Sequence, residues 1–273
     1  MNRRTLLCTP IATRLAGAFP AAATRNQYIE LSFYFLSGGP GQSSRLTEFL
    51  ENQHLPMTKR LGIGPVGYFG LREAPESARA AAQRKGEALP EPGSRFVTLT
   101  IYDSWSAVEA KRAAQRADKI WTEVVDAMIG QPPAYDRMET WLLRAFDGIP
   151  KVEVPPSGGD RKPRIFELRN AETPNLGAQA RKIEMWNKGE IQVFRTCRLN
   201  PLFFGETLSG SRMPNFWYMI WFDGPEAREA AWDAFRKDPD WARMQKDPRY
   251  KGATMPGSPI HSFNRWVFHP FVR

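Results

Sequence analysis

Alternating apolar and polar residues predict several strands in this chain, and the predicted elements occur in the same order twice. YIELSFYFL (28–36) and RIFELRNAE (164–172) each alternate around a Glu-Leu pair, as strands with one buried face do. Three later stretches are also repeated: GPVGYFG (64–70) as NPLFFGE (200–206), FVTLTIYDSWSAVEAKRAAQRA (96–117) as FWYMIWFDGPEAREAAWDAFRK (216–237), and METWLLRAF (138–146) as FNRWVFHPF (263–271). The sequence therefore indicates an internal duplication.

A helical pattern separates the first and second strands of each copy, in SSRLTEFLENQHLPMTKRLG (43–62) and LGAQARKIEMWNKGE (176–190). Each copy then reads strand, helix, strand, strand, helix, strand, which is the ferredoxin-like order. We predict an α+β protein with one such repeat at 24–147 and another at 164–273. The segment 148–163 is rich in proline, glycine and charge, and is the expected linker.

One predicted strand of the second copy is apolar on both faces. Phe216, Tyr218, Ile220 and Phe222 alternate with Trp217, Met219 and Trp221. Burying each such side chain is worth about 1.5–3 kcal/mol, so neither row is expected in water. The helices of a ferredoxin-like unit cover only one face of its sheet. We therefore expect the sheet of the other copy to cover the second face in an α/β barrel, or else the sheet of a second chain.

Charge and length narrow the class of protein. The 273 residues carry 38 Lys and Arg against 29 Asp and Glu, a formal charge of +9, with both signs mixed along the chain. This is typical of a solvated surface, and we expect no nucleic-acid partner. No stretch of about 20 apolar residues occurs, so no membrane span is expected.

The first 23 residues resemble a bacterial export signal of the twin-arginine type. Arg3 and Arg4 precede a weakly apolar stretch, and Ala21 to Ala23 form a small-residue cleavage site. We expect a periplasmic or extracellular protein. Cleavage would remove Cys8 and leave Cys197 as the only thiol, so no intramolecular disulfide is expected.

The second copy carries a more specific resemblance. Its ELR strand (167–169), the sequence that follows to Asp223, and the DPDW motif (238–241) resemble the NIPSNAP family, and FLENQHLPMTKRLGIGPVGYF (49–69) is similar to the divergent first copy of bacterial two-copy members. The resemblance implies a dimeric α/β-barrel fold. It implies no particular reaction, because the family has no established chemistry.

Candidate catalytic residues lie in the first copy. Enzymes of the wider superfamily work in a cavity between helices and sheet, and Tyr34, Tyr68 and Glu30 could converge there with His54. A neutral histidine beside tyrosine hydroxyls can move a proton near neutral pH. The three histidines lack the spacing of a metal site, so no metal is expected, and no cofactor motif is present.

The candidate ligand-binding residues are Glu30, Thr98, Arg169 and Trp217. Arg169 either pairs with Glu167 or anchors an anionic group of a ligand. We expect a protein that binds a small apolar or aromatic ligand in an aromatic-lined cavity, or an assembly protein. The alternatives are a cofactor-independent monooxygenase or isomerase, and a scaffold with an open apolar patch. The sequence leaves open whether two molecules form a homodimer and what the 72–95 insertion does.

Overall fold

The computed structural model describes residues 26–73, 79–80, 83, 91–156, 164–251 and, as backbone, 263–270. The predicted export signal, and parts of the insertion and of the linker, lie outside these residues. Among the residues described, no helix is long and apolar enough to cross a membrane.

The first repeat contains every element that the pattern predicts, with a break in its first helix. In chain order the elements are β1 (Tyr28–Phe35), α1 (Gly39–Phe49), the π-helical segment η1 (Leu50–His54), α2 (Leu55–Arg60), β2 (Val66–Leu71), β3 (Arg95–Tyr102), α4 (Trp105–Ala117), α5 (Lys119–Ala127) and β4 (Arg137–Ala145).

The second repeat follows the same order and has a π-helical segment at the equivalent place. Its elements are β5 (Ile165–Glu172), α6 (Leu176–Met185), η2 (Trp186–Glu190), α7 (Ile191–Thr196), β6 (Asn200–Ser209), β7 (Asn215–Phe222), α8 (Pro225–Lys237), α9 (Pro239–Lys246), the short η3 (Pro248–Tyr250) and β8 (Phe263–Pro270). The first helix of this repeat thus continues six residues past the predicted Glu190.

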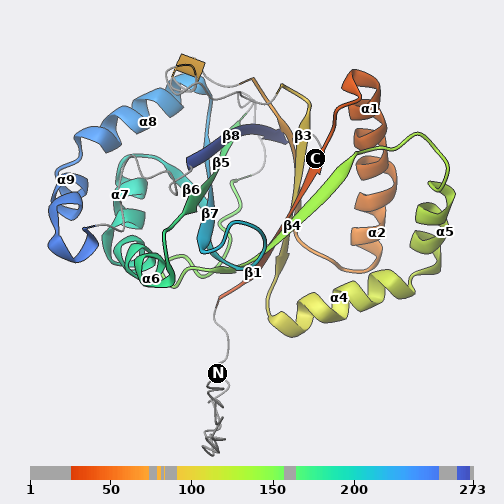
Figure 1. The fold of residues 1–273 in the computed structure, drawn as a ribbon, viewed down its shortest axis with the longest axis horizontal. Coiled ribbons are helices and arrows are strands. Elements are labelled where there is room, and N and C mark those ends of the chain that lie inside the picture. Colours follow the sequence, from red (N-terminus) through yellow and green to blue (C-terminus); the bar gives the residue numbers. More distant parts are fainter. Residues whose placement is uncertain are drawn as a thin grey trace, which may run out of the picture.

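The two sheets join edge to edge into one closed antiparallel barrel. The strand order is β1-β3-β2-β8-β5-β7-β6-β4, and β4 returns to β1. Each repeat contributes a ferredoxin-like sheet, and the contacts β2 to β8 and β4 to β6 join the sheets. The helices lie outside, with α1, α2, α4 and α5 on one side and α6 to α9 on the other (Figure 1). This confirms the predicted fold class.

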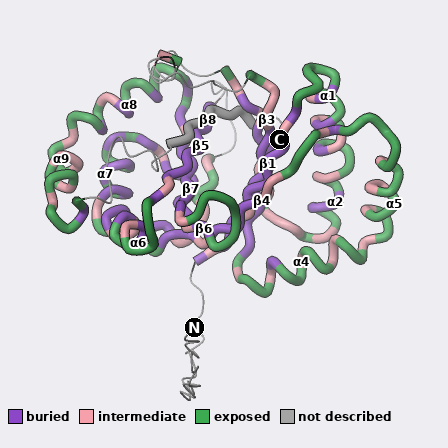
Figure 2. The backbone as a smooth tube through the Cα atoms, in the orientation of Figure 1, coloured by how far each residue is buried: buried purple, intermediate pink, exposed green. Residues whose placement is uncertain are grey.

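The barrel explains why β7 is apolar on both faces. Trp217 and Met219 point into the barrel, where they pack among apolar side chains from both repeats, including Leu31, Val97 and Leu143. The alternate row, which includes Phe216 and Tyr218, packs outward beneath the helices of the second repeat. Figure 2 shows the buried backbone concentrated in the central strands, with exposed positions on the outer helices. The second apolar face of β7 is therefore covered by the other repeat, as the first of the two expectations stated.

The β6–β7 hairpin bends over one end of the barrel interior. Trp141 of β4 donates from Nε1 to the carbonyl of Ser211 at 3.4 Å. Asn215 fixes the hairpin turn, because its side-chain amide donates to the carbonyls of Ser211 and Arg212 at 2.8 Å each. Asn215 is buried, and its Oδ1 accepts from Thr207 at 2.5 Å. The turn is thus fixed by buried hydrogen bonds.

Candidate functional site

His54 lies at the end of the π-helical segment and faces the outer surface of the first sheet. Its Nδ1 is 2.8 Å from the hydroxyl of Tyr68 on β2. A π-helical turn inserts one extra residue per turn and often occurs at functional sites. Here the segment η1 ends at His54, directly before α2.

A row of hydroxyl groups continues from Tyr68 across the sheet. Thr98 on β3 lies directly opposite Tyr68, and its side chain hydrogen-bonds with the hydroxyl of Tyr34 on β1. Tyr68 also hydrogen-bonds with the side chain of Thr58 on α2. Tyr34, Tyr68 and Thr98 are all buried. The sheet therefore brings together three of the residues predicted from sequence, next to His54.

Burial keeps this cluster uncharged. It lowers the pKa of His54 to about 4, because a charged imidazole would lose its hydration. Burial likewise raises the pKa of Tyr68 to about 12, and it raises the pKa of Tyr34 above its usual value against the opposing effect of the Thr98 hydrogen bond. Near neutral pH the pair is therefore a neutral imidazole beside a neutral phenol.

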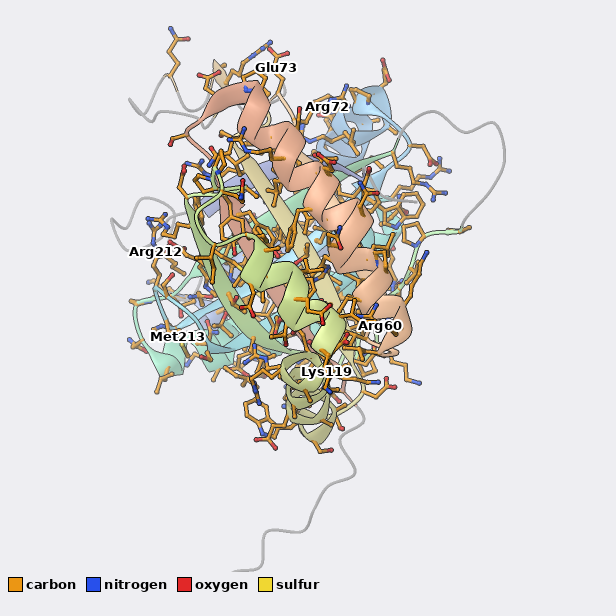
Figure 3. The ribbon with its side chains drawn as sticks, turned by 90° about the vertical axis from the view of Figure 1, so that its right-hand side faces the viewer. Arg60, Arg72, Glu73, Lys119, Arg212 and Met213 are labelled. Atoms are coloured by element: carbon orange, nitrogen blue, oxygen red, sulfur yellow. The ribbon has the colours of Figure 1, made fainter. Side chains whose placement is uncertain are left out.

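Half-buried aromatic and apolar side chains separate this cluster from solvent. The indole of Trp121 on α5 stands edge-on to His54, with ring centres 5.9 Å apart, and lies 5.7 Å from the ring of Phe49. Phe49, Leu55 and Met128 pack at the margin of the buried cluster. Figure 3 views this side, with Arg60 at the end of α2 close to Lys119 at the start of α5. An ion pair between Arg60 and Asp118 joins the two helices there.

The second repeat has charged groups at the equivalent place. Glu190 ends η2 as His54 ends η1. Its carboxyl is buried, and burial raises its pKa against the opposing effects of Lys182 and Arg169. Burial also lowers the pKa of Lys182. Phe204 stands at the repeat position of Tyr68, and its ring is tilted against Trp186 with ring centres 4.5 Å apart. At this position the second repeat therefore has a phenyl ring in place of the Tyr68 phenol.

The repeated Glu-Leu pair also has a different environment in each repeat. Glu30 accepts from Arg112 of α4, with Nε at 3.2 Å, and the guanidinium is about half exposed. Glu167 is fully buried and accepts from Arg228 at 2.7 Å and from the indole of Trp232 at 3.2 Å. Arg169 lies 3.5 Å from Glu167, and its guanidinium stacks over Trp232 at 4.4 Å. The predicted Arg169–Glu167 pair is present, but Arg228 is the nearer partner.

The candidate residues predicted from sequence lie in three separate places. His54, Tyr34, Tyr68, Thr98 and Glu30 lie under the helices of the first repeat. Arg169 lies under the helices of the second repeat. Trp217 is inside the barrel, edge-on to Trp141 at 5.3 Å. The residues described contain no group of three or more potential metal ligands.

The sequence pattern alone did not point to Trp121, Thr58, Arg228 or Glu190. Trp121 and Thr58 occupy ordinary positions of helical segments, and only tertiary packing brings them to His54. The duplication held one usable signal, since aligning the two copies would have placed Glu190 close to His54.

Comparison with known proteins agrees with this architecture. The NIPSNAP family model matches residues 167–255, so the second repeat carries a NIPSNAP domain. No curated protein matches the chain with significance. A Lactobacillus acidophilus NCFM protein with the provisional name of monooxygenase is 11% identical, with a TM-score of 0.53 over 89% of this chain and 93% of its own.

Two further solved structures are similar. A Fusobacterium nucleatum protein, also provisionally named a monooxygenase, is 8% identical with a TM-score of 0.52, over 90% of this chain and 92% of its own. A chlorite dismutase variant from Candidatus Nitrospira defluvii is 10% identical with a TM-score of 0.42, over 90% and 92%. At 11% and 8% identity, the similarity to the Lactobacillus and Fusobacterium proteins shows a shared fold and not an activity.

Proposed function

We propose that this chain is an exported binding protein for a small aromatic ligand that carries a hydroxyl group, and that the ligand contacts the first repeat beside His54. The observation that supports the proposal is the His54–Tyr68 pair, held at 2.8 Å beneath half-buried aromatic side chains. The pair offers a polar contact for a hydroxyl group, and the rings of Trp121 and Phe49 offer an apolar contact for the ligand ring.

Binding of 1-naphthol tests this proposal. We expect isothermal titration calorimetry to detect binding to the full chain, and His54→Ala to weaken it by about tenfold, the effect of one lost hydrogen bond. Tyr28→Phe is the matched control. Tyr28 lies on the same face of β1 as Tyr34, but it packs away from His54, in a cluster with Tyr102 and Val108. Unchanged affinity after His54→Ala, or no binding of aromatic alcohols by the wild type, would refute the proposal.

The second candidate is a cofactor-independent monooxygenase or isomerase, and one observation favours it. His54 Nδ1 lies 2.8 Å from the Tyr68 hydroxyl, and a neutral imidazole placed in this way can accept a proton from a bound phenol or carbon acid. The two provisionally named monooxygenases share the fold.

Turnover distinguishes the two candidates. With an oxidisable naphthalenediol, a monooxygenase would take up oxygen faster than buffer alone, and with an unsaturated lactone an isomerase would form the isomer faster than buffer alone. His54→Ala and Tyr34→Phe would abolish either excess rate. A binding protein would accelerate neither reaction, and the same variants would alter only affinity.

A further inference from the structure

Strand β4 has an unpaired edge along its first half. On one side it pairs with β1 along its length, from Arg137 opposite Phe35 to Arg144 opposite Tyr28. On the other side β6 pairs only with residues 142–145. Within the part of the chain that the structure describes, residues 137–141 therefore have a strand neighbour on one side only.

The hydrogen-bond pattern shows which backbone groups face this open side. Ala145 donates to Gln27 on the β1 side, whereas Phe146 donates to Phe204 on the β6 side. Because neighbouring residues of an antiparallel strand bond to opposite sides, odd-numbered residues of β4 bond to β1. The N–H and C=O groups of Met138 and Thr140 therefore point away from β1, toward the edge where β6 no longer pairs with β4.

Exposed apolar side chains lie along and beside this edge. Met138 is 48% exposed, and Leu208 and Met213 of the adjacent hairpin are 41% and 48% exposed. Figure 3 shows the labelled Arg212 and Met213 on the far side of β4 from α5. Buried hydrogen bonds from Asn215 fix the hairpin, so these side chains are presented without a large ordering cost.

We propose that this edge pairs antiparallel with the same edge of a second copy of this chain, with Met138 at the two-fold axis. Charge complementarity selects both the partner and the register. With Met138 opposite Met138 of the partner subunit, Arg137 lies opposite Glu139 of the partner subunit, and the reverse pair forms by symmetry. If the two-fold axis lay at Glu139 instead, Glu139 would face Glu139 of the partner subunit, and the two like charges would repel each other.

The side chains involved are suitably placed for this pairing. Arg137 and Glu139 lie 2.9 Å apart within one chain, with side chains 61% and 34% exposed. Two such pairs facing each other form a ring of alternating charge. The edge itself is short, so contacts by Leu208 and Met213 would have to enlarge the interface toward the area of a stable dimer.

Sedimentation velocity across low-micromolar to near-millimolar protein tests the dimer, using the wild type, Arg137→Glu and the exchange Arg137→Glu with Glu139→Arg. We expect concentration-dependent dimerisation of the wild type, weakened by about tenfold or more in R137E, where like charges oppose. The exchange variant restores both cross-strand pairs and should dimerise like the wild type. Arg243→Glu on α9, whose side chain is 75% exposed, is the control for a change in net charge.

Hydrogen exchange of the wild-type protein gives a second measurement that needs no variant. The Thr140 amide should become more protected as protein concentration rises, while the Leu143 amide, within the closed β4–β1 ladder, should not change. A wild type that stays monomeric throughout, or a dimer that R137E leaves intact, would overturn the proposal.

Discussion

His54 and Glu190 are the last residues of the two π-helical segments, so the duplication places a histidine and a glutamate at equivalent positions beneath the two halves of one barrel. Both side chains face the outer surface of their own sheet, and burial shifts the pKa of each toward its neutral form. The first repeat pairs its histidine with a tyrosine hydroxyl, and the second surrounds its glutamate with cations. The same backbone thus holds two different polar sites.

His54 is expected to make the protein less stable as the pH falls. The folded pKa is about 4, below the unfolded value of about 6.5. The contribution is therefore complete above about pH 6.5 and is lost as the pH falls toward 4, up to about 2–3 kcal/mol. Urea denaturation from about pH 7 to pH 4.5 measures it. His54→Gln should remove this part of the pH dependence, and an equal slope in the variant would contradict the assignment.

Glu190 is expected to make the protein less stable as the pH rises, the opposite of His54. Its folded pKa lies above the unfolded value of about 4.3, so its contribution is complete below that pH and is lost as the pH rises through the raised folded value. Glu190→Gln cannot titrate. The stability of the wild type relative to this variant should therefore fall between about pH 5 and pH 9. A difference that is constant over this range would show that Glu190 is ionised throughout.

The two glutamates of the repeated Glu-Leu pair should differ strongly in their effect on stability. Glu167→Gln removes the buried carboxylate partner of Arg228, which keeps only its ion pair with the half-exposed Glu229, and we expect a loss of about 3 kcal/mol. Glu30→Gln is the matched variant in the first repeat. It should cost less than about 1 kcal/mol, because Arg112 is half exposed. Chemical denaturation of both variants measures the difference, and equal losses would contradict this reasoning.

The sequence predicted the architecture because the duplication and strand alternation are local signals. Both apolar rows of β7 had to be buried. The helices of the second repeat bury one row, and the barrel interior buries the other. The shortened contact between β4 and β6 could not be predicted, because it depends on a register shift between Leu142 and Leu143. Arg228 was missed for a similar reason. On α8 it reads as a surface residue of an amphipathic helix, and only the tertiary fold places it on Glu167.

The hairpin that bends over the barrel requires glycine at position 210. A Cβ on Gly210 would lie 2.2 Å from Cδ1 of Trp141, and the backbone has a φ of +156°. Gly210→Ala must therefore displace either the indole or the hairpin, and we expect a loss of about 2–4 kcal/mol. Gly130→Ala is the control, since its φ is +79° but no atom lies within 4 Å of the added Cβ. This control should cost only about 1 kcal/mol for its backbone conformation. Denaturation midpoints of the two variants separate steric contact from backbone strain, and similar losses would show that Trp141 moves aside freely.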